Sequence, residues 1–241
     1  MVTITKSDKI GFSCDHARIS GASTNLCVAA ANLLCTEFSL PGFHIDLRKR
    51  IPIGAGLGGG SSDAAAVILG GLKLYEIAPP LAEIQTLSSR LGSDVPFFIT
   101  GKSAYATGRG EKLDPINITT NYQILLLFPG IHISTAWAYK NLNLGLTQQW
   151  TDNKFISSEF HRLKVSSFQS VFFNSFESVV FREYPVLADM KQVLVRKGAL
   201  FAGMSGSGST IFGLFDRDSD LISITGDLQP KYNYQIAVPV V

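Results

Sequence analysis

Five glycines lie between positions 54 and 60 of the 241-residue chain, and two serines follow them directly. The preceding segment, FHIDLRKRIPIG, alternates apolar and polar side chains and is typical of a strand, whereas SSDAAAVILGGLKLYEI is typical of a helix. Residues without a Cβ let backbone N–H groups approach an anion, and a helix N-terminus adds partial positive charge. This order therefore predicts a phosphate-binding loop; the alternative is a glycine turn needed only for tight packing.

The start of that helix has its own signals. Ser61 or Ser62 is expected to be the N-cap, with Asp63 near the positive end of the helix dipole. The serine hydroxyls add donors and could touch a metal ion held by the phosphates. Gly70 and Gly71 weaken the helix locally, which predicts close packing against a neighbour.

Two well-known phosphate loops fit this segment poorly. The Walker pattern needs Gly-Lys-Ser/Thr, and this loop contains no lysine. A dinucleotide fingerprint is formally present as Gly54-x-Gly56-x-x-Gly59, but the preceding strand carries the charged run Arg48-Lys49-Arg50. That run is unlike a buried central strand, and another helix follows where an acidic strand end is required. We therefore discount a Rossmann domain.

Asp94 and a second glycine cluster are the other candidates for chemistry. Asp94 lies between Gly92 and the apolar run 95–98, so we expect it to be partly buried, and a buried carboxylate is rare unless paired or functional. A helix or turn cap is the alternative. The second cluster is denser than a hairpin turn needs, which predicts a backbone that approaches another segment, here the phosphate loop. Its members are Gly203, Ser205, Gly206, Ser207 and Gly208.

Composition and charge exclude several classes of protein. Hydrophobic residues make up 46% of the chain and charged residues 17%, which fits a folded protein with a large core. A net charge of +2 gives no basic field for nucleic acid, and no apolar run is long enough for a membrane span. The histidines form no metal-ligand pattern. Three cysteines and a polar, β-like start favour reduced thiols in the cytoplasm.

The order of elements predicts two domains. PLAEIQTLSSRLG reads as a helix and KSAYATGRGEKLDPI as two short strands. From Asn121 onward a strand is followed by helices to about Lys197, two strands around the second glycine cluster, a short helix and a last strand. This is the split βαβ order of a ferredoxin-like domain, so we divide the chain into residues 1–120 and 121–241.

Three segments in this order resemble the GHMP kinase family: PIGAGLGGGSSDAAA, LGSDVPFFITGKSAYATGRGEKL and GMSGSGSTIFGLF. The resemblance implies an α+β, two-domain fold with a ribosomal-S5-domain-2-like N-terminal part and a ferredoxin-like C-terminal domain. It implies ATP and Mg²⁺ as cofactors and a cytidine-diphosphate-linked alcohol as the substrate. The implied ATP-binding residues are Pro52, Ile53, Gly54, Ala55, Gly56, Leu57, Gly58, Gly59, Gly60, Ser61 and Ser62.

The same resemblance assigns roles to single residues. It makes Asp94 the group that accepts or orients the proton of the attacking hydroxyl. It places Asn25 beside the adenine, where the alternative is a helix cap, and it places Thr135 and Tyr139 near the substrate. For Thr135 the alternative is a cap of its own helix. For Tyr139 an ordinary half-buried helix aromatic is the alternative.

The chain departs from the family pattern at its start. The family opens with a strand bearing Ala-Lys-Ile/Leu-Asn and then a segment with Asp-Gly-Tyr-His, and neither is present. We therefore expect a truncated N-terminal domain and impaired catalysis. An ATP-binding remnant without transfer, or a kinase for another alcohol, is the alternative function.

Overall fold

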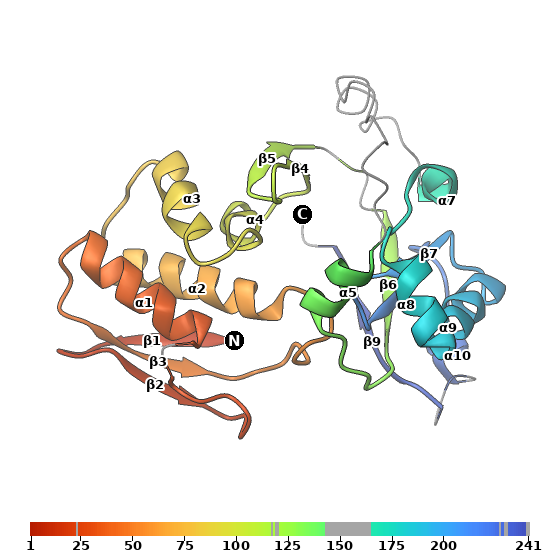
Figure 1. Ribbon diagram of the computed structural model, residues 1–241, viewed down its shortest axis with the longest axis horizontal. Helices are drawn as coiled ribbons and strands as arrows, with labels where there is room; N and C mark the ends of the chain where they lie inside the picture. Colours follow the sequence, from red (N-terminus) through yellow and green to blue (C-terminus); the bar gives the residue numbers. More distant parts are fainter. Residues whose placement is uncertain are drawn as a thin grey trace. The chain divides into compact units, whose positions relative to one another are not determined.

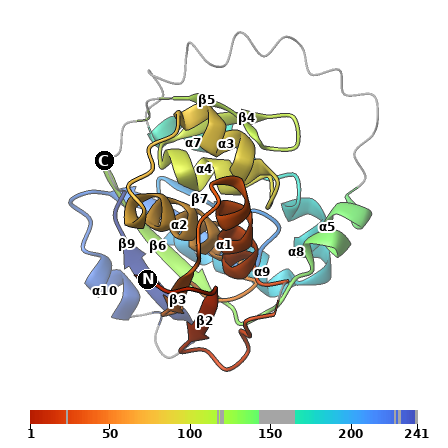
Figure 2. The same cartoon turned by 90° about the vertical axis from the view of Figure 1, so that its left-hand side faces the viewer.

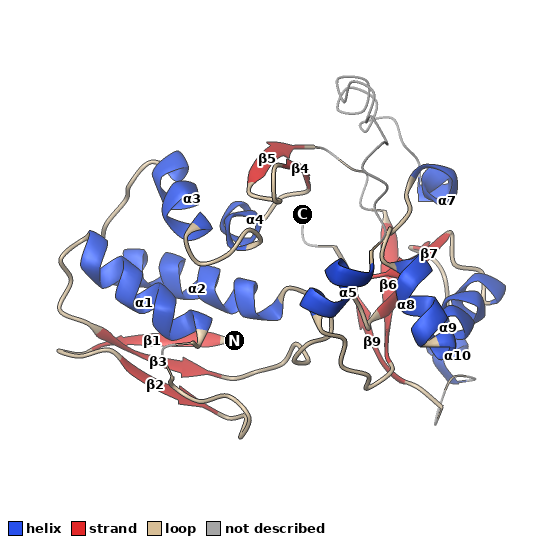
Figure 3. Cartoon of the chain, viewed as in Figure 1, coloured by secondary structure: helices blue, strands red, loops and turns tan. Residues whose placement is uncertain are grey.

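The computed structural model describes residues 1–22, 24–116, 118, 121–142, 165–226, 228 and 231–239. The chain forms two compact units, residues 1–53 with 58–116, and residues 54–57 with 117–241. Each unit contains both helices and strands (Figure 3), and the predicted α+β class is confirmed. In the described parts, none of the helices combines the length and apolarity needed to cross a lipid bilayer.

A three-stranded sheet forms the base of the first unit. Its strands are β1 (Val2–Lys6), β2 (Gly11–Cys14) and β3 (Phe43–Leu47), in the order β1-β3-β2. The central β3 pairs antiparallel with β1 and parallel with β2. Phe43, Ile45 and Leu47 are buried on one face, as their alternation predicts.

Helices cover this sheet in two layers. Helices α1 (Leu26–Glu37) and α2 (Gly59–Leu74) lie on the sheet, and beyond them lie α3 (Leu81–Ser89), α4 (Val95–Thr100) and the hairpin of β4 (Ala104–Thr107) and β5 (Lys112–Pro115) (Figures 1 and 2). A Cβ on Gly70 would lie 2.7 Å from Ile4 Cδ1, and one on Gly71 would clash with Leu34. The predicted close packing at these glycines is confirmed.

The second unit is built on a four-stranded antiparallel sheet. Its order is β7-β8-β6-β9, which is the ferredoxin-like topology predicted from the sequence. The strands are β6 (Tyr122–Phe128), β7 (Phe201–Met204), β8 (Ile211–Asp216) and β9 (Asn233–Ala237). The helical elements are α5 (Thr135–Asn141), a 3-10 turn (Val165–Ser167), α7 (Phe168–Val171), α8 (Glu177–Glu183), α9 (Pro185–Arg196) and α10 (Leu221–Gly226). Helical structure expected within 143–164 lies outside the described residues.

Both faces of this second sheet are apolar. Leu125 and Leu127 are fully buried in a cluster with Met190 of α9. Ile124 points to the opposite face, where it packs in a smaller cluster with Phe212 and helix α7. Strand β7 is an edge strand, and it leads directly into the second glycine cluster.

Candidate functional site

Three alternate glycines give the loop at 54–58 a backbone that other residues avoid. The φ angle is +66° at Gly54, +74° at Gly56 and +62° at Gly58. A Cβ on Gly56 would also lie 2.6 Å from the carbonyl oxygen of Gly208. These positions therefore require glycine for the fold itself.

The first turn of α2 presents a set of unused donors. The helix begins at Gly59, so the expectation that Ser61 or Ser62 is its N-cap is wrong: both lie within the first turn, and Gly58 holds the N-cap position. The Ser62 N–H donates to Gly58 O at 2.9 Å. The N–H groups of Gly59, Gly60 and Ser61 and both serine hydroxyls have no partner among the described residues. This arrangement is suited to an anion.

Gly59 and Gly60 differ in the space that their neighbours leave for a side chain. A Cβ on Gly59 would lie 2.9 Å from Ile51 Cγ2 and 3.0 Å from Lys49 Nζ, so its neighbours exclude a side chain. Gly60 lies in ordinary helix, is exposed, and a Cβ there would meet only Leu26 Cδ1 at 3.5 Å. Glycine at position 60 therefore has no steric reason within the described chain.

The rest of the predicted loop is only partly accessible. Pro52 and Ile53 are exposed, Leu57 is half-buried, and Ala55 is buried. The carbonyl oxygen of Ala55 accepts from the Thr210 N–H at 3.2 Å. The main chain of Ala55 is therefore hydrogen-bonded within the second unit, to which residues 54–57 belong.

A buried ion pair joins the end of β3 to the first turns of α2. Lys49 Nζ donates to the Asp63 carboxylate, and the two side chains expose only 6% and 13% of their surface. The Lys49 N–H donates to Asp15 Oδ1 at 2.8 Å, and this bond is the main cause that lowers the pKa of Asp15. Sequence reasoning missed the pair. The sequence does contain a signal for it: the alternation of buried residues at 43, 45 and 47 continues to position 49, which places Lys49 on the buried face of the strand.

The second glycine cluster contacts the loop, as expected. Ser205 Oγ donates to the Gly56 carbonyl oxygen at 2.8 Å. A Cβ on Gly206 would lie 3.2 Å from the same oxygen. Residues 54–57 and the cluster therefore approach each other main chain to main chain within the second unit. A role of Gly203, Ser207 or Gly208 in binding stays a prediction.

Asp94 precedes α4, and its side chain is exposed, so the expectation of partial burial is wrong. The fully buried Val95 takes the inward position instead. Asp94 makes no capping bond, and Ser93 Oγ donates to its Oδ1 at 3.4 Å. A Cβ on Gly58 would lie 2.7 Å from Phe98 Cζ, so the helix that carries Asp94 packs against the start of α2. The carboxylate is accessible to a substrate, and its catalytic role stays a prediction.

Asn25 is the N-cap of α1. Its Oδ1 accepts from the Cys27 N–H at 2.9 Å, and its Nδ2 donates to Ser20 O at 2.8 Å. These bonds match the helix-cap alternative. Recognition of a base would use the lone pair and N–H that remain, and it stays a prediction.

Thr135 and Tyr139 lie on the short helix α5. Its N-cap is Ser134, which accepts from the Trp137 N–H, so the alternative that Thr135 caps this helix is wrong. Thr135 Oγ1 and Ser207 Oγ are hydrogen-bonded at 3.0 Å, so this helix contacts the second glycine cluster. Tyr139 is 62% exposed, more than the half-buried aromatic that was the alternative. Its ring packs edge-on against Phe176 at a centroid distance of 4.9 Å. An exposed aromatic ring that packs against a second aromatic on one side is suited to stacking on a flat ligand.

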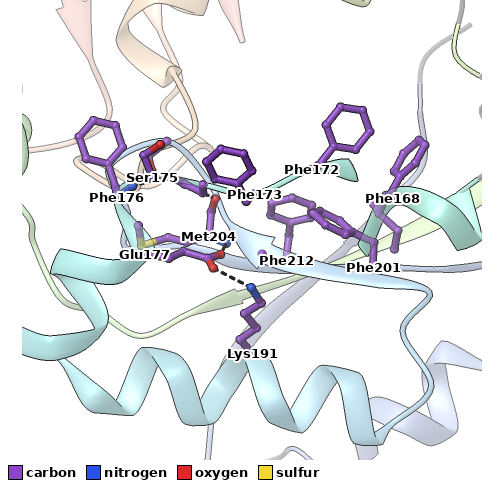
Figure 4. A pocket seen from close by; sticks show the side chains of 14 residues that line it. Phe168, Phe172, Phe173, Ser175, Phe176, Glu177, Lys191, Phe201, Met204 and Phe212 are labelled. Carbon is purple, nitrogen blue, oxygen red and sulfur yellow. Dashed lines mark hydrogen bonds and ion pairs between the residues drawn. The ribbon is translucent and has the colours of Figure 1, made fainter. Parts of the chain in front are cut away.

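A cavity of about 570 Å³ lies beside strand β7. Figure 4 shows phenylalanines on one side and Glu177 and Lys191 on the other, joined by a 2.6 Å ion pair. Sequence reasoning did not predict this cavity, because its walls come from separate elements. No cluster of three His, Cys, Asp or Glu side chains suited to a metal ion occurs in the described parts of the chain.

Comparison with known proteins decides the family. Residues 25–102 match the GHMP kinases N terminal domain, and residues 158–233 match the GHMP kinases C terminal domain. The chain belongs to the GHMP kinase family. As a GHMP kinase it is an ATP-dependent phosphotransferase.

Individual GHMP kinases narrow the comparison. The chain is 39% identical to 4-diphosphocytidyl-2-C-methyl-D-erythritol kinase of Prosthecochloris aestuarii, over 96% of this chain and 82% of that protein. It is 38% identical to the protein of that name in Chlorobaculum tepidum, over 95% and 80%. A crystal structure of 4-(cytidine 5'-diphospho)-2C-methyl-D-erythritol kinase has a TM-score of 0.76 at 30% identity, covering 98% of this chain and 84% of that one. Homoserine kinase from Cytophaga hutchinsonii shares the fold, with a TM-score of 0.66 at 15% identity and coverage of 100% and 84%.

Proposed function

We propose that this GHMP kinase transfers the γ-phosphate of ATP to the 2-hydroxyl of 4-diphosphocytidyl-2-C-methyl-D-erythritol, in non-mevalonate isoprenoid precursor synthesis. One observation carries the choice of substrate: relatives of that name are 35–40% identical across most of the chain, whereas a mevalonate kinase of the same fold is 16% identical. The three glycine and aspartate motifs recognised in the sequence support the same choice.

The nucleotide's phosphates would be bound by main-chain donors. The free N–H groups of Gly59, Gly60 and Ser61, at the positive end of α2, are suited to the phosphate oxygens. Gly60 leaves its backbone open to close approach, and the hydroxyls of Ser61 and Ser62 add further donors. Catalysis would then rest on positioning and on stabilisation of charge.

Asp94 would handle the proton of the acceptor alcohol. A bond forms between the substrate oxygen and the γ-phosphorus while the bond from that phosphorus to the β,γ-bridging oxygen breaks, which leaves ADP. The hydroxyl proton passes to the Asp94 carboxylate. Asp94 makes no capping bond, and among the described residues it accepts only the 3.4 Å bond from Ser93 Oγ to its Oδ1, so its Oδ2 is left to accept a proton.

Magnesium fits the phosphate oxygens together with the serine hydroxyl oxygens at the start of α2. Mg²⁺ keeps several waters and binds phosphate oxygens with few protein ligands, so the lack of a carboxylate cluster in the described residues is compatible with it. The hydroxyl of Ser61 or Ser62 would hold the ion, which would neutralise charge on the phosphates. A cytoplasmic setting is part of the proposal, and the free thiols of Cys14, Cys27 and Cys35 support it.

The test is ATP-dependent phosphorylation of the cytidine-linked substrate by the purified chain, with homoserine and mevalonate as alternative acceptors. Asp94→Asn should lower kcat by about 100-fold or more while leaving the Kd for ATP within about two-fold. Asp114→Asn, an exposed carboxylate on β5, is the matched control and should behave as the wild type. ATP binding without transfer to any acceptor would identify a non-catalytic remnant and end the proposal.

A further inference from the structure

The segment Asn174–Glu177 contacts two parts of the candidate site from one side. It runs from the loop after α7 to the first residue of α8, and its contacts with the second glycine cluster and with Tyr139 all lie within the second unit. The side-chain contacts of this segment, rather than its sequence, suggest a role in positioning.

Asn174 and Glu177 hold the main chain where β7 enters the second glycine cluster. Asn174 Nδ2 donates to Met204 O and to Gly206 O, each at 2.7 Å, while its Oδ1 accepts from Phe176 N at 2.9 Å. Glu177 Oε1 accepts from Met204 N at 2.8 Å. Both polar groups of Met204, on an edge strand, are thereby satisfied by side chains.

This attachment is largely buried and continues to the phosphate loop. Lys191 donates to Glu177 Oε2 at 2.6 Å, and the two side chains expose only 18% and 15% of their surface (Figure 4). One residue after Met204, Ser205 donates to Gly56 O at 2.8 Å. A displacement of Met204 would therefore move the residue that holds the loop.

Phe176, which lies between Asn174 and Glu177 in the sequence, contacts Tyr139 instead of the second glycine cluster. The Phe176 ring packs edge-on against Tyr139, at 4.9 Å and an interplanar angle of 88°. Tyr139 is otherwise largely exposed, and among the described residues Phe176 is the aromatic side chain that its ring contacts.

We propose that residues 174–177 are a shared positioning segment: Asn174 and Glu177 hold residues 54–57, which lead directly into the ATP donors proposed at the start of α2, and Phe176 positions Tyr139 for the acceptor substrate. The inference rests on the proposed function. A merely structural role would lower stability without separating the two substrates.

The test separates the two Michaelis constants in the full chain. Asn174→Ala should raise KM for ATP about ten-fold and leave KM for the cytidine-linked substrate within about two-fold. Phe176→Leu should raise KM for the cytidine-linked substrate about five-fold and leave that for ATP unchanged, and Phe176→Tyr, which keeps the ring, should restore it. Asn233→Ala, on the opposite edge of the sheet, is the control and should behave as the wild type.

Equal changes in both constants, or lost stability with unchanged constants, would overturn the inference. If Asn174→Ala does not fold, Asn174→Ser keeps one donor and should raise KM for ATP about three-fold. If the wild type shows no turnover, the proposed function fails. The inference is then judged by calorimetric Kd values for ATP and for the cytidine-linked compound, which should show the same separation.

Discussion

Gly60 is a glycine that the fold does not require, so its presence is better explained by a ligand. Its neighbours in the loop are glycine because of positive φ or because a side chain would clash, but neither reason applies at position 60. Glycine inside a helix also costs stability relative to alanine. Its presence therefore favours close approach by something outside the described chain, and the unused N–H groups around it favour an anion.

Replacing Gly60 by alanine should improve stability and damage binding. We expect Gly60→Ala to raise the free energy of unfolding by about 0.5–1 kcal/mol, because the unfolded chain loses conformational freedom. The added methyl group should raise KM for ATP about ten-fold by blocking the phosphates. Urea titration and steady-state kinetics measure the two effects.

Gly226→Ala is the matched control. Gly226 is also exposed, as the last residue of helix α10, and a Cβ there would meet nothing within 4 Å. It should raise stability without changing KM for ATP. A Gly60→Ala protein with the same behaviour would remove Gly60 from the phosphate site.

Cys27 predicts how stability depends on alkaline pH. Burial raises the pKa of its thiol from 9.0 to about 12, and the charge of Asp63 adds to this effect. The unfolded thiol ionises first, so its contribution is complete below pH 9 and is lost as pH rises toward 12. The free energy of unfolding should fall by up to about 1.4 kcal/mol per pH unit in this window. In denaturant titrations from pH 8 to 11, the free energy of unfolding of Cys27→Ala should fall less steeply with pH than that of the wild type. An identical slope would contradict the raised pKa of Cys27.

At the residue scale, the sequence located candidates better than it described their surroundings. Asp94 was expected inside because an apolar run follows it, but Val95 takes the buried position and leaves the carboxylate exposed. Asn25 was recognised together with its capping alternative, and the cap is what its contacts match. Local sequence predicts which residue types can do chemistry, but tertiary packing decides which of them face solvent.

At the scale of elements, the Lys49–Asp63 ion pair fixes the end of β3 to α2. Removing one charged partner should leave the other charge buried and unpaired. Lys49→Met should therefore lower the free energy of unfolding by about 3–5 kcal/mol. Chemical denaturation measures this effect. The combined Lys49→Met and Asp63→Leu variant should recover most of the loss, since no charge then remains buried.

The control for this pair is an exposed one. Arg90 and Glu37 are joined at 3.3 Å but expose 59% and 45% of their side chains. Arg90→Met should therefore change stability by about 1 kcal/mol or less. If Lys49→Met is no more destabilising than Arg90→Met, the buried pair does not anchor α2.

The elements were predictable where periodicity was strong. Alternation in residues 43–47 and the long apolar helix at 59–74 correspond to observed structure. The start of that helix was placed too late because Ser61 and Ser62 are good N-cap residues, whereas Gly58 fills that position through a left-handed backbone that composition does not reveal. Contacts such as Asn174 with Met204 depend on the completed sheet and have no local signal.

At the scale of the whole molecule, the order of elements was sufficient to predict the sheet of the second unit. A split βαβ order has few allowed topologies, and β7-β8-β6-β9 is the one observed. The assignment of residues 54–57 to that unit was not predictable, because it depends on bonds such as Ser205 to Gly56 across a long sequence separation.

Nucleotide binding should stabilise the whole molecule in proportion to the phosphates that α2 receives. ATP at about 100 times its Kd should add about 2.7 kcal/mol to the free energy of unfolding, or about 5–10 °C in Tm for a protein of this size. AMP lacks the β- and γ-phosphates, so at the same concentration it should give a clearly smaller shift. Scanning fluorimetry with Mg²⁺ present measures both. Because the donors at the start of α2 can recognise only the phosphate chain, equal shifts with ATP and AMP would mean that the triphosphate binds elsewhere.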